Sequence, residues 1–132
     1  MERANDKYMN KGKILIVDDD PNLSRLMSVF LSKMGGYVLC EENRPSAAFL
    51  TAKSFQPDLI LMDVEMPGKN GGEVAAEMSK DSALAKTPVI FVTSLVSKNE
   101  AGWRNGKRFM SKPVDPQTLL KTVQEILQPV CA

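Results

Sequence analysis

The fold of this chain is decided by the stretch Leu59-Ile60-Leu61-Met62-Asp63, which is followed closely by Met66-Pro67-Gly68-Lys69-Asn70-Gly71-Gly72. A short apolar run bounded by turn-forming residues predicts a buried strand, with Asp63 at its carboxyl end. In an open parallel α/β sheet, ligands bind at that edge. A carboxylate buried there is costly unless a partner offsets its charge, so Asp63 is a candidate functional residue.

Three further apolar runs also end in polar residues. Lys13–Val17 leads into Asp18 and Asp19, residues 88–92 lead into Thr93, and Arg108–Ser111 leads into Lys112. Helical patterns lie between the runs, and two of them begin with an aspartate followed by proline, at Asp20-Pro21 and Asp115-Pro116. Strands that alternate with helices predict a parallel sheet covered on both faces. Carboxylates, a hydroxyl and an ammonium group are therefore expected at one edge of this sheet.

Length and composition narrow the possible classes of protein. A chain of 132 residues is expected to hold one domain, here residues 13–128, between a flexible tail of residues 1–12 and a C-terminal tail of residues 129–132. The net charge of +1 argues against direct nucleic-acid binding. No apolar run approaches the roughly 20 residues of a membrane span, and the N-terminus shows no secretion signal. With Cys40 and Cys131 interpreted as reduced thiols, we expect a cytoplasmic protein without a membrane association.

The predicted cluster of Asp18, Asp19 and Asp63 requires a cation. Two carboxylates about 5 Å apart repel each other by roughly 3 kcal/mol at an effective dielectric constant near 20. Lys112 supplies one positive charge, which does not balance three negative ones. A site with oxygen ligands only suits Mg²⁺ or Mn²⁺, and the absence of histidine excludes nearly all histidine-containing metal sites.

A metal beside a carboxylate, a lysine and a hydroxyl is suited to phosphoryl transfer. The Asp63 carboxylate would attack phosphorus and form an acyl phosphate. Lys112 and Thr93, together with the metal, would share the charge on the phosphoryl oxygens. A carboxylate is already ionised at pH 7, so this chemistry needs no histidine in the chain, provided that the phosphoryl donor lies elsewhere.

These motifs resemble the receiver domains of two-component response regulators, and the resemblance runs from about Lys13 to Leu127. The segments that carry it, in chain order, are Val17-Asp18-Asp19, Met62-Asp63-Val64-Glu65-Met66-Pro67-Gly68, Val92-Thr93-Ser94 and Lys112-Pro113. The fold that the resemblance implies is a flavodoxin-like, doubly wound, five-stranded parallel sheet with strand order 2-1-3-4-5, built from five strand–helix units.

The resemblance also implies a role for each matching residue. Asp63 matches the phospho-acceptor, Asp19 a direct metal ligand, and Asp18 an acidic position that often acts through water. The backbone carbonyl of Glu65 would complete the protein ligands. The remaining matches are Lys112 as the phosphate-pairing lysine, usually before a cis proline, and Thr93 with Phe109 as the switch pair.

The resemblance implies a signalling switch and not an enzyme, although such a domain assists its own phosphorylation and dephosphorylation. The expected partner is a sensor histidine kinase or a histidine phosphotransfer protein. The output surface would comprise the fourth helix, the fifth strand and the fifth helix. Only eighteen residues separate Thr93 from Lys112, so we expect a shortened fourth helix, and hence a monomer or a weak, phosphorylation-dependent dimer.

Two alternatives stay open from the sequence. One is a receiver-like interaction domain that is never phosphorylated. The other is a metal-dependent phosphatase with an aspartate nucleophile, although such enzymes generally carry a second aspartate where this chain has Glu65. The kinase, the response and the presence of further domains cannot be inferred from these residues.

Overall fold

The computed structural model describes residues 11–96, 102–104 and 107–127, and they form one mixed α/β layer structure. Its central sheet has the strand order β2-β1-β3-β4-β6-β5. The strands are β1 (Lys13–Val17), β2 (Val38–Glu42), β3 (Leu59–Asp63), β4 (Val89–Thr93), β5 (Gly102–Arg104) and β6 (Lys107–Ser111). All pairs are parallel except β5 with β6. The expected five-stranded parallel order is therefore confirmed, with β6 as its fifth strand.

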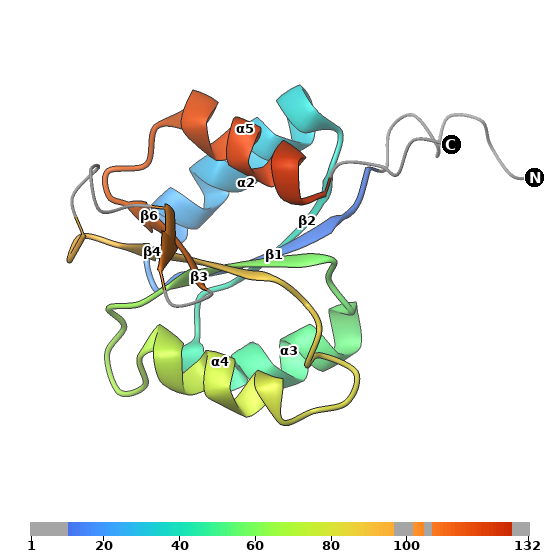
Figure 1. Cartoon of the computed structure of the whole chain (residues 1–132), viewed down its shortest axis with the longest axis vertical. Coiled ribbons are helices and arrows are strands. Elements are labelled where there is room, and N and C mark those ends of the chain that lie inside the picture. The colour runs from blue at the N-terminus through green and yellow to red at the C-terminus, as the bar shows by residue number, and fades with distance from the viewer. Residues whose placement is uncertain (1–10, 97–101, 105–106, 128–132) are drawn as a thin grey trace, which may run out of the picture.

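Helices cover both faces of the sheet, as Figure 1 shows. Helices α2 (Pro21–Gly35) and α5 (Pro116–Ile126) lie on one face, whereas α3 (Ala48–Phe55) and α4 (Gly71–Ser79) lie on the other. A single 3-10 turn, η1 (Pro45–Ala47), leads into α3. This arrangement confirms a sheet whose two faces are both buried.

Both predicted aspartate–proline helix starts are confirmed. The Asp20 side chain accepts hydrogen bonds from the backbone N–H groups of Asn22 and Leu23, and Asp115 accepts one from Thr118. At the other end of α2, Gly36 adopts φ 74°, a left-handed conformation that glycine takes without steric cost. These caps fix where each helix begins, and so they fix the loops that carry the polar strand ends.

The core consists of two apolar clusters, one on each face of the sheet. Alternate residues of a strand enter different clusters, because side chains point to opposite faces with a period of two. In β1, Ile14 and Ile16 pack toward α2 and α5, whereas Leu15 and Val17 pack toward α3 and α4. Strand β3 is buried along its whole length, and Asp63, its last residue, is therefore anchored by a core strand.

The segment before β6 differs from the expected short fourth helix. Gly102–Arg104 forms strand β5, which pairs antiparallel with β6 and places Trp103 opposite Arg108. Gly102 has φ +111°, which a helix does not allow and which favours glycine. Among the described residues, no helix lies between β4 and β6, and the rest of the expected helix falls outside them. The glycine and asparagine content of this stretch, which disfavours helix, is the physical reason.

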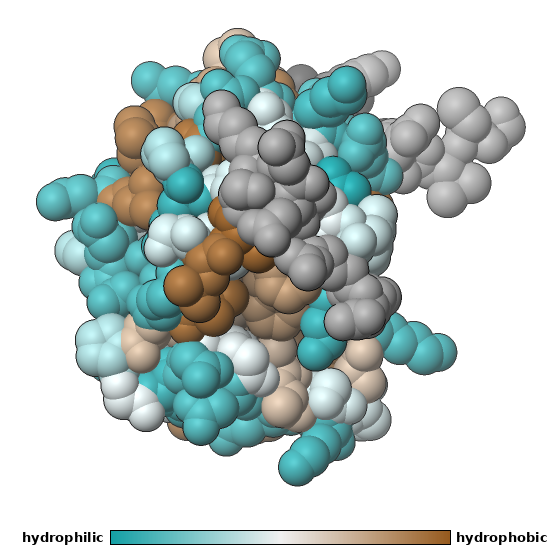
Figure 2. Space-filling view, turned by 60° about the vertical axis from the view of Figure 1, so that its left-hand side comes forward, coloured by the Kyte–Doolittle hydropathy of each residue, from teal (hydrophilic) through white to brown (hydrophobic). Residues whose placement is uncertain are grey.

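Figure 2 shows a largely polar surface on which apolar side chains emerge in a small central patch. Leu95, two residues after the end of β4, is 76% exposed, the highest value for a large hydrophobic side chain in the described part of the chain. No helix there has the length and apolar character needed to cross a bilayer. Cys40 is a free thiol. Cys131, residues 1–10 of the expected N-terminal tail (residues 1–12) and the whole expected C-terminal tail (residues 129–132) lie outside the described residues.

Candidate phosphoryl-acceptor and metal site

Three carboxylates meet at the carboxyl ends of β1 and β3. Asp18 follows the last residue of β1, and Asp63 is the last residue of β3. One oxygen from each of Asp18, Asp19 and Asp63 lies within 4.8 Å of the others. Asp18 and Asp63 are buried, while Asp19 is exposed, so the cluster opens toward solvent on one side. The structure therefore brings together the three acidic residues that the sequence predicts.

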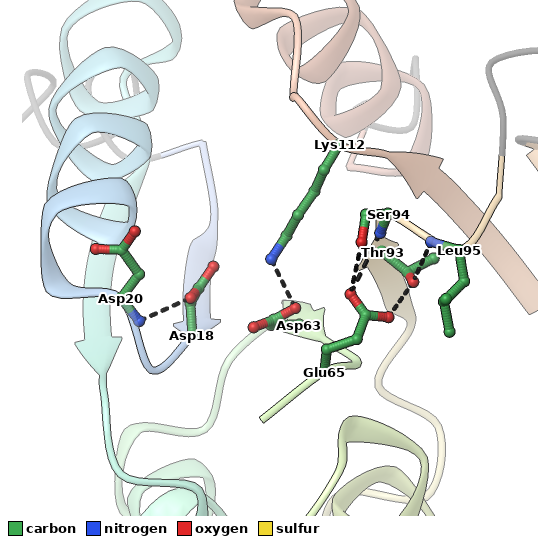
Figure 3. Close-up of polar contacts among 8 residues, drawn as sticks. All are labelled: Asp18, Asp20, Asp63, Glu65, Thr93, Ser94, Leu95 and Lys112. Carbon is green, nitrogen blue, oxygen red and sulfur yellow. Dashed lines mark hydrogen bonds and ion pairs between the residues drawn. The ribbon is translucent and has the colours of Figure 1, made fainter. Parts of the chain in front are cut away.

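Lys112 reaches the cluster from the loop after β6. Its Nζ donates a hydrogen bond to Asp63 Oδ1 at 2.8 Å, and Figure 3 shows its side chain directed at this carboxylate. The Lys112 backbone N–H donates to the Thr93 carbonyl at 2.9 Å, which fixes the start of that loop against β4. The Lys112–Pro113 peptide bond is cis, as the resemblance leads us to expect.

Asp63 has one oxygen paired and one left without a partner. The side chain is only 1% exposed, and no group in the described part of the chain donates a hydrogen bond to the buried Oδ2. Burial raises the pKa of Asp63 to about 6, because the attraction of Lys112 does not outweigh burial and the repulsion from Asp18 and Glu65. A buried acceptor without a partner is costly, so this oxygen has the environment of a group that awaits a ligand.

Burial, hydrogen bonds and nearby charges also shift the pKa values of Asp18 and Lys112. Burial raises the pKa of Asp18, and hydrogen bonding from the Asp20 backbone offsets this only in part. Burial alone would lower the pKa of Lys112, but its hydrogen bond to Asp63 and the surrounding negative charges reverse the sign and raise it. Lys112 is therefore held as a cation, while two of the three acids resist ionisation.

A divalent cation fits the acidic cluster. The donor set consists of carboxylate oxygens, which Mg²⁺ and Mn²⁺ prefer, and the free Oδ2 of Asp63 is a ligand without any competing partner. Asp20 does not take part in the cluster, because its carboxylate caps α2 and its backbone N–H donates to Asp18 Oδ1 at 2.9 Å. The residues that would hold the ion are thus Asp18, Asp19 and Asp63.

The Glu65 side chain turns away from the acidic cluster toward the end of β4. Its carboxylate accepts a hydrogen bond from the Thr93 hydroxyl, and it accepts two more from Ser94, at 3.2 Å from the backbone N–H and 3.4 Å from Oγ. Thr93 Oγ1 in turn accepts from the Leu95 N–H at 3.0 Å. Figure 3 shows this network beside the Asp63–Lys112 pair. The role predicted for the Glu65 backbone carbonyl stays a prediction.

Phe109 lies half-buried on β6 and stacks against Phe91 of β4, with ring centroids 5.3 Å apart. It packs at the margin of the cluster that faces α3 and α4. Its backbone pairs with Phe91, two residues before Thr93 along β4. The switch role of Phe109 remains a prediction, and its position beside the strand that ends in Thr93 is compatible with it.

Two residues that support the site escaped sequence reasoning. Asn43 Nδ2 donates to the Asp18 carbonyl and to Ser24 Oγ, both at 2.8 Å, and so ties the loop after β1 to the loop after β2. Gly71 lies so close to β3 that an added Cβ would come within 2.2 Å of the Asp63 carbonyl oxygen. Neither has a signal in one sequence, although Asn43 follows a predicted strand and Gly71 belongs to a glycine pair.

Comparison with known proteins agrees with this geometry. The model of the response regulator receiver domain family matches residues 14–124. The chain is 40% identical over 118 residues to protein PilH of Pseudomonas aeruginosa, covering 87% of this chain and 97% of PilH. It is 30% identical to the phosphate regulon transcriptional regulatory protein PhoB of the same species, of which it spans 51%.

Among solved structures, the chemotaxis response regulator CheY4 of Vibrio cholerae superposes with a TM-score of 0.74 at 30% identity, covering 86% of this chain and 97% of that chain. The match of the family model spans most of the chain, and PilH and CheY4 are matched over nearly their whole length. The sequence motifs, the sheet order and these likenesses lead to one conclusion: this chain belongs to the receiver domains of two-component response regulators.

Proposed function

We propose that this protein is a phosphorelay receiver that accepts a phosphoryl group on Asp63 in a Mg²⁺-dependent reaction. The observation that carries the proposal is the state of the Asp63 carboxylate. Lys112 holds Oδ1, while Oδ2 is buried, has no hydrogen-bond partner among residues 11–96, 102–104 and 107–127, and lies beside two further carboxylates. An acid in this position is poised to act as a nucleophile once its charge is balanced.

The transfer is a displacement at phosphorus. One oxygen of ionised Asp63 forms a bond to the phosphorus of a phosphohistidine, and the bond from phosphorus to the imidazole nitrogen breaks, leaving its electron pair on the nitrogen. Lys112 keeps Asp63 oriented and offers its positive charge to the transferred oxygens. Thr93, at the end of the neighbouring strand, would donate its hydroxyl hydrogen to the product.

A divalent ion held by Asp18, Asp19 and Asp63 would neutralise charge on the phosphoryl oxygens. Without a cation, the acidic cluster repels an incoming phosphate, because Lys112 is the one cation among the described residues that bonds to Asp63. The chain's own residues then bind the ion, fix the carboxylate and supply the hydroxyl and ammonium donors.

The phosphoryl donor would be a sensor histidine kinase or a histidine phosphotransfer protein, because this chain has no histidine of its own. We propose a switch without an enzymatic activity toward other substrates, working in the cytoplasm through the surface around β4, β6 and α5. PhoB is named as a transcriptional regulator, but this chain spans only half of PhoB, and we propose no direct contact with nucleic acid for it.

Mass spectrometry after incubation with acetyl phosphate tests the proposal. With Mg²⁺, the wild-type protein should gain the mass of one phosphoryl group, and it should gain none in EDTA. The Asp63→Asn variant should stay unlabelled. Labelling of Asp63→Asn to the wild-type extent would contradict the assignment. Steady release of inorganic phosphate from a phosphoester would instead favour the phosphatase alternative.

A further inference from the structure

The hydroxyl hydrogen of Thr93 is already committed in this structure. Thr93 is 2% exposed, and its Oγ1 donates to the Glu65 carboxylate while accepting from the Leu95 N–H. A hydroxyl carries one hydrogen, so it cannot donate fully to two anions at once. A phosphoryl group on Asp63 would therefore find this donor occupied by a resident carboxylate.

The same carboxylate also occupies Ser94. Its backbone N–H and its hydroxyl both donate to Glu65 Oε1, so one anion gathers three donors from the two residues at the end of β4. Figure 3 shows Glu65 on the side of Asp63 that faces β4, with its carboxylate directed at Thr93 and Ser94. These are donors of the kind that bind phosphoryl oxygens.

We propose that Glu65 is an intramolecular competitor for the Thr93 hydroxyl and holds Ser94 and Leu95, the first residues after Thr93, in their unphosphorylated arrangement. This inference rests on the proposed phosphorylation of Asp63. The phosphoryl group must displace the Glu65 carboxylate from Thr93 before the hydroxyl can turn to it. Glu65 is thus a positioning residue that sets how far phosphorylation drives the switch.

The competition extends to Leu95. The Leu95 backbone N–H donates to Thr93 Oγ1, the same oxygen whose hydrogen is donated to Glu65, and the Leu95 side chain is 76% exposed. If Thr93 Oγ1 moves toward a phosphoryl group on Asp63, the Leu95 N–H loses this acceptor, so the backbone at residues 94–95 and the exposed Leu95 side chain would be free to shift together. The hydrogen bond between Glu65 and Thr93 is therefore coupled to the position of Leu95 on the surface beside β4, where a partner would bind.

Binding of beryllofluoride in the presence of Mg²⁺, followed by backbone NMR, tests this proposal without a phosphoryl lifetime. Glu65→Ala should bind beryllofluoride about tenfold more tightly than wild type, because a charge-assisted hydrogen bond contributes roughly that factor. Glu65→Gln, which keeps an acceptor but loses the charge, should lie between them. The matched control is Glu77→Ala, which removes the same charge from exposed helix α4 and should leave the affinity unchanged.

A double-mutant cycle with Thr93→Ala separates the competition from general damage. In the Thr93→Ala background, the gain from Glu65→Ala should shrink to about twofold, since no hydroxyl is left to release. Before beryllofluoride is added, Glu65→Ala should also shift the amide resonances of Ser94 and Leu95. A structural defect would weaken binding, so tighter binding is the opposite of what loss of folding predicts.

The outcomes are distinct. If wild type binds beryllofluoride and Glu65→Ala binds it equally well or more weakly, the competition is overturned while the proposed function stands. An unchanged gain in the Thr93→Ala background would also overturn it, because the effect would then not pass through the hydroxyl. If no variant binds beryllofluoride with Mg²⁺, the proposed function itself fails, and this inference fails with it.

Discussion

Asp63 is a buried acid whose ionised form is costly for the folded protein. Its carboxylate is buried beside Asp18, and its pKa is raised to about 6 by burial. At pH 7.5 Asp63 is therefore ionised, but without metal its ionisation costs more free energy in the folded protein than in the unfolded chain, although Lys112 offsets part of that cost. A bound cation would remove this electrostatic penalty by balancing the charge of the carboxylates.

We expect Asp63→Asn to stabilise the metal-free protein. Replacing the buried charge by a neutral amide of the same shape should raise the free energy of unfolding by about 1–2 kcal/mol, less than the raised pKa alone suggests because Lys112 loses its partner. Urea denaturation in EDTA at pH 7.5 measures this change. A loss of stability above 1 kcal/mol would show that the Asp63–Lys112 pair is a net stabiliser.

Magnesium should stabilise the wild-type protein but not the Asp63→Asn variant. A ligand that binds only the folded state stabilises it by about 1.4 kcal/mol at ten times its dissociation constant. Saturating Mg²⁺ should therefore raise the melting temperature of wild type and leave that of Asp63→Asn nearly unchanged. Equal shifts in both proteins would place the ion elsewhere.

Glu42 gives the protein a second, purely structural dependence on pH. It lies 6% exposed at the end of β2 and accepts hydrogen bonds from Thr51 Oγ1 at 2.6 Å and from the Arg44 backbone N–H at 2.9 Å. Burial by itself would raise the pKa of Glu42, but these bonds outweigh it and lower the pKa below the ordinary 4.5.

Because the folded pKa is lowered, the stability contributed by Glu42 is fully present above pH 4.5 and is lost as the pH falls through the folded value. Glu42→Gln should therefore lower the free energy of unfolding by about 1–2 kcal/mol at pH 7. The difference between wild type and variant should shrink below pH 4. Denaturation curves over this range measure it, and a difference that is constant with pH would refute the ionised network.

At the scale of elements, the loop from β3 to α4 depends on the close approach of Gly71. A Cβ there would meet the Asp63 carbonyl oxygen at 2.2 Å and Met62 Cγ at 2.8 Å. Backbone cannot give way cheaply, so α4 would have to shift away from the strand that carries Asp63. Asn70 and Glu73 form a capping box at this same helix start, which anchors the helix in its present position.

Gly71→Ala should lower the free energy of unfolding by about 2–3 kcal/mol through this clash, and it should weaken Mg²⁺ binding by displacing Asp63. Gly72→Ala is the matched control, because its Cβ would approach only Asn70 Oδ1, at 3.2 Å. We expect Gly72→Ala to change stability by less than about 1 kcal/mol. Chemical denaturation of both variants measures the contrast, and equal effects would contradict the close approach.

For the whole molecule, the end of the sheet beyond β4 determines how it can associate. The expected output surface needs a fourth helix, but among the described residues β5 occupies the segment before β6. Trp103 on β5 is 65% exposed, and the Arg108 guanidinium carbon lies over its ring, 5.7 Å from the ring centroid. The edge of this sheet is therefore a short strand and not a helix face.

We expect phosphorylation to strengthen self-association only weakly, because no fourth helix is present among the described residues between β4 and β6 to form a dimer surface. Sizing chromatography with light scattering should show a mainly monomeric protein, both with and without beryllofluoride and Mg²⁺. A protein concentration of about 50 μM is high enough to detect a complex with a micromolar dissociation constant. Full conversion to a dimer on adding beryllofluoride would overturn this expectation.

The parallel sheet and the polar groups at the ends of its strands could be predicted from the sequence. Apolar runs that end in Asp18, Asp63, Thr93 and Lys112 predict a parallel sheet with polar groups at one edge, because strand direction places all carboxyl ends together. The aspartate–proline helix starts were predictable for the same kind of local reason, since a capping side chain acts within three residues.

Which of these groups bind one another depends on the packing of the folded chain and could not be predicted from the sequence. The bonds from Thr93 and Ser94 to Glu65 join residues 28 and 29 positions apart, and the free Oδ2 of Asp63 follows from the packing around it. Strand β5 likewise depends on pairing with β6, because a segment this short has only a weak local preference for any secondary structure. Periodicity reports which face a residue occupies, whereas partners across loops depend on distances that no single stretch of sequence contains.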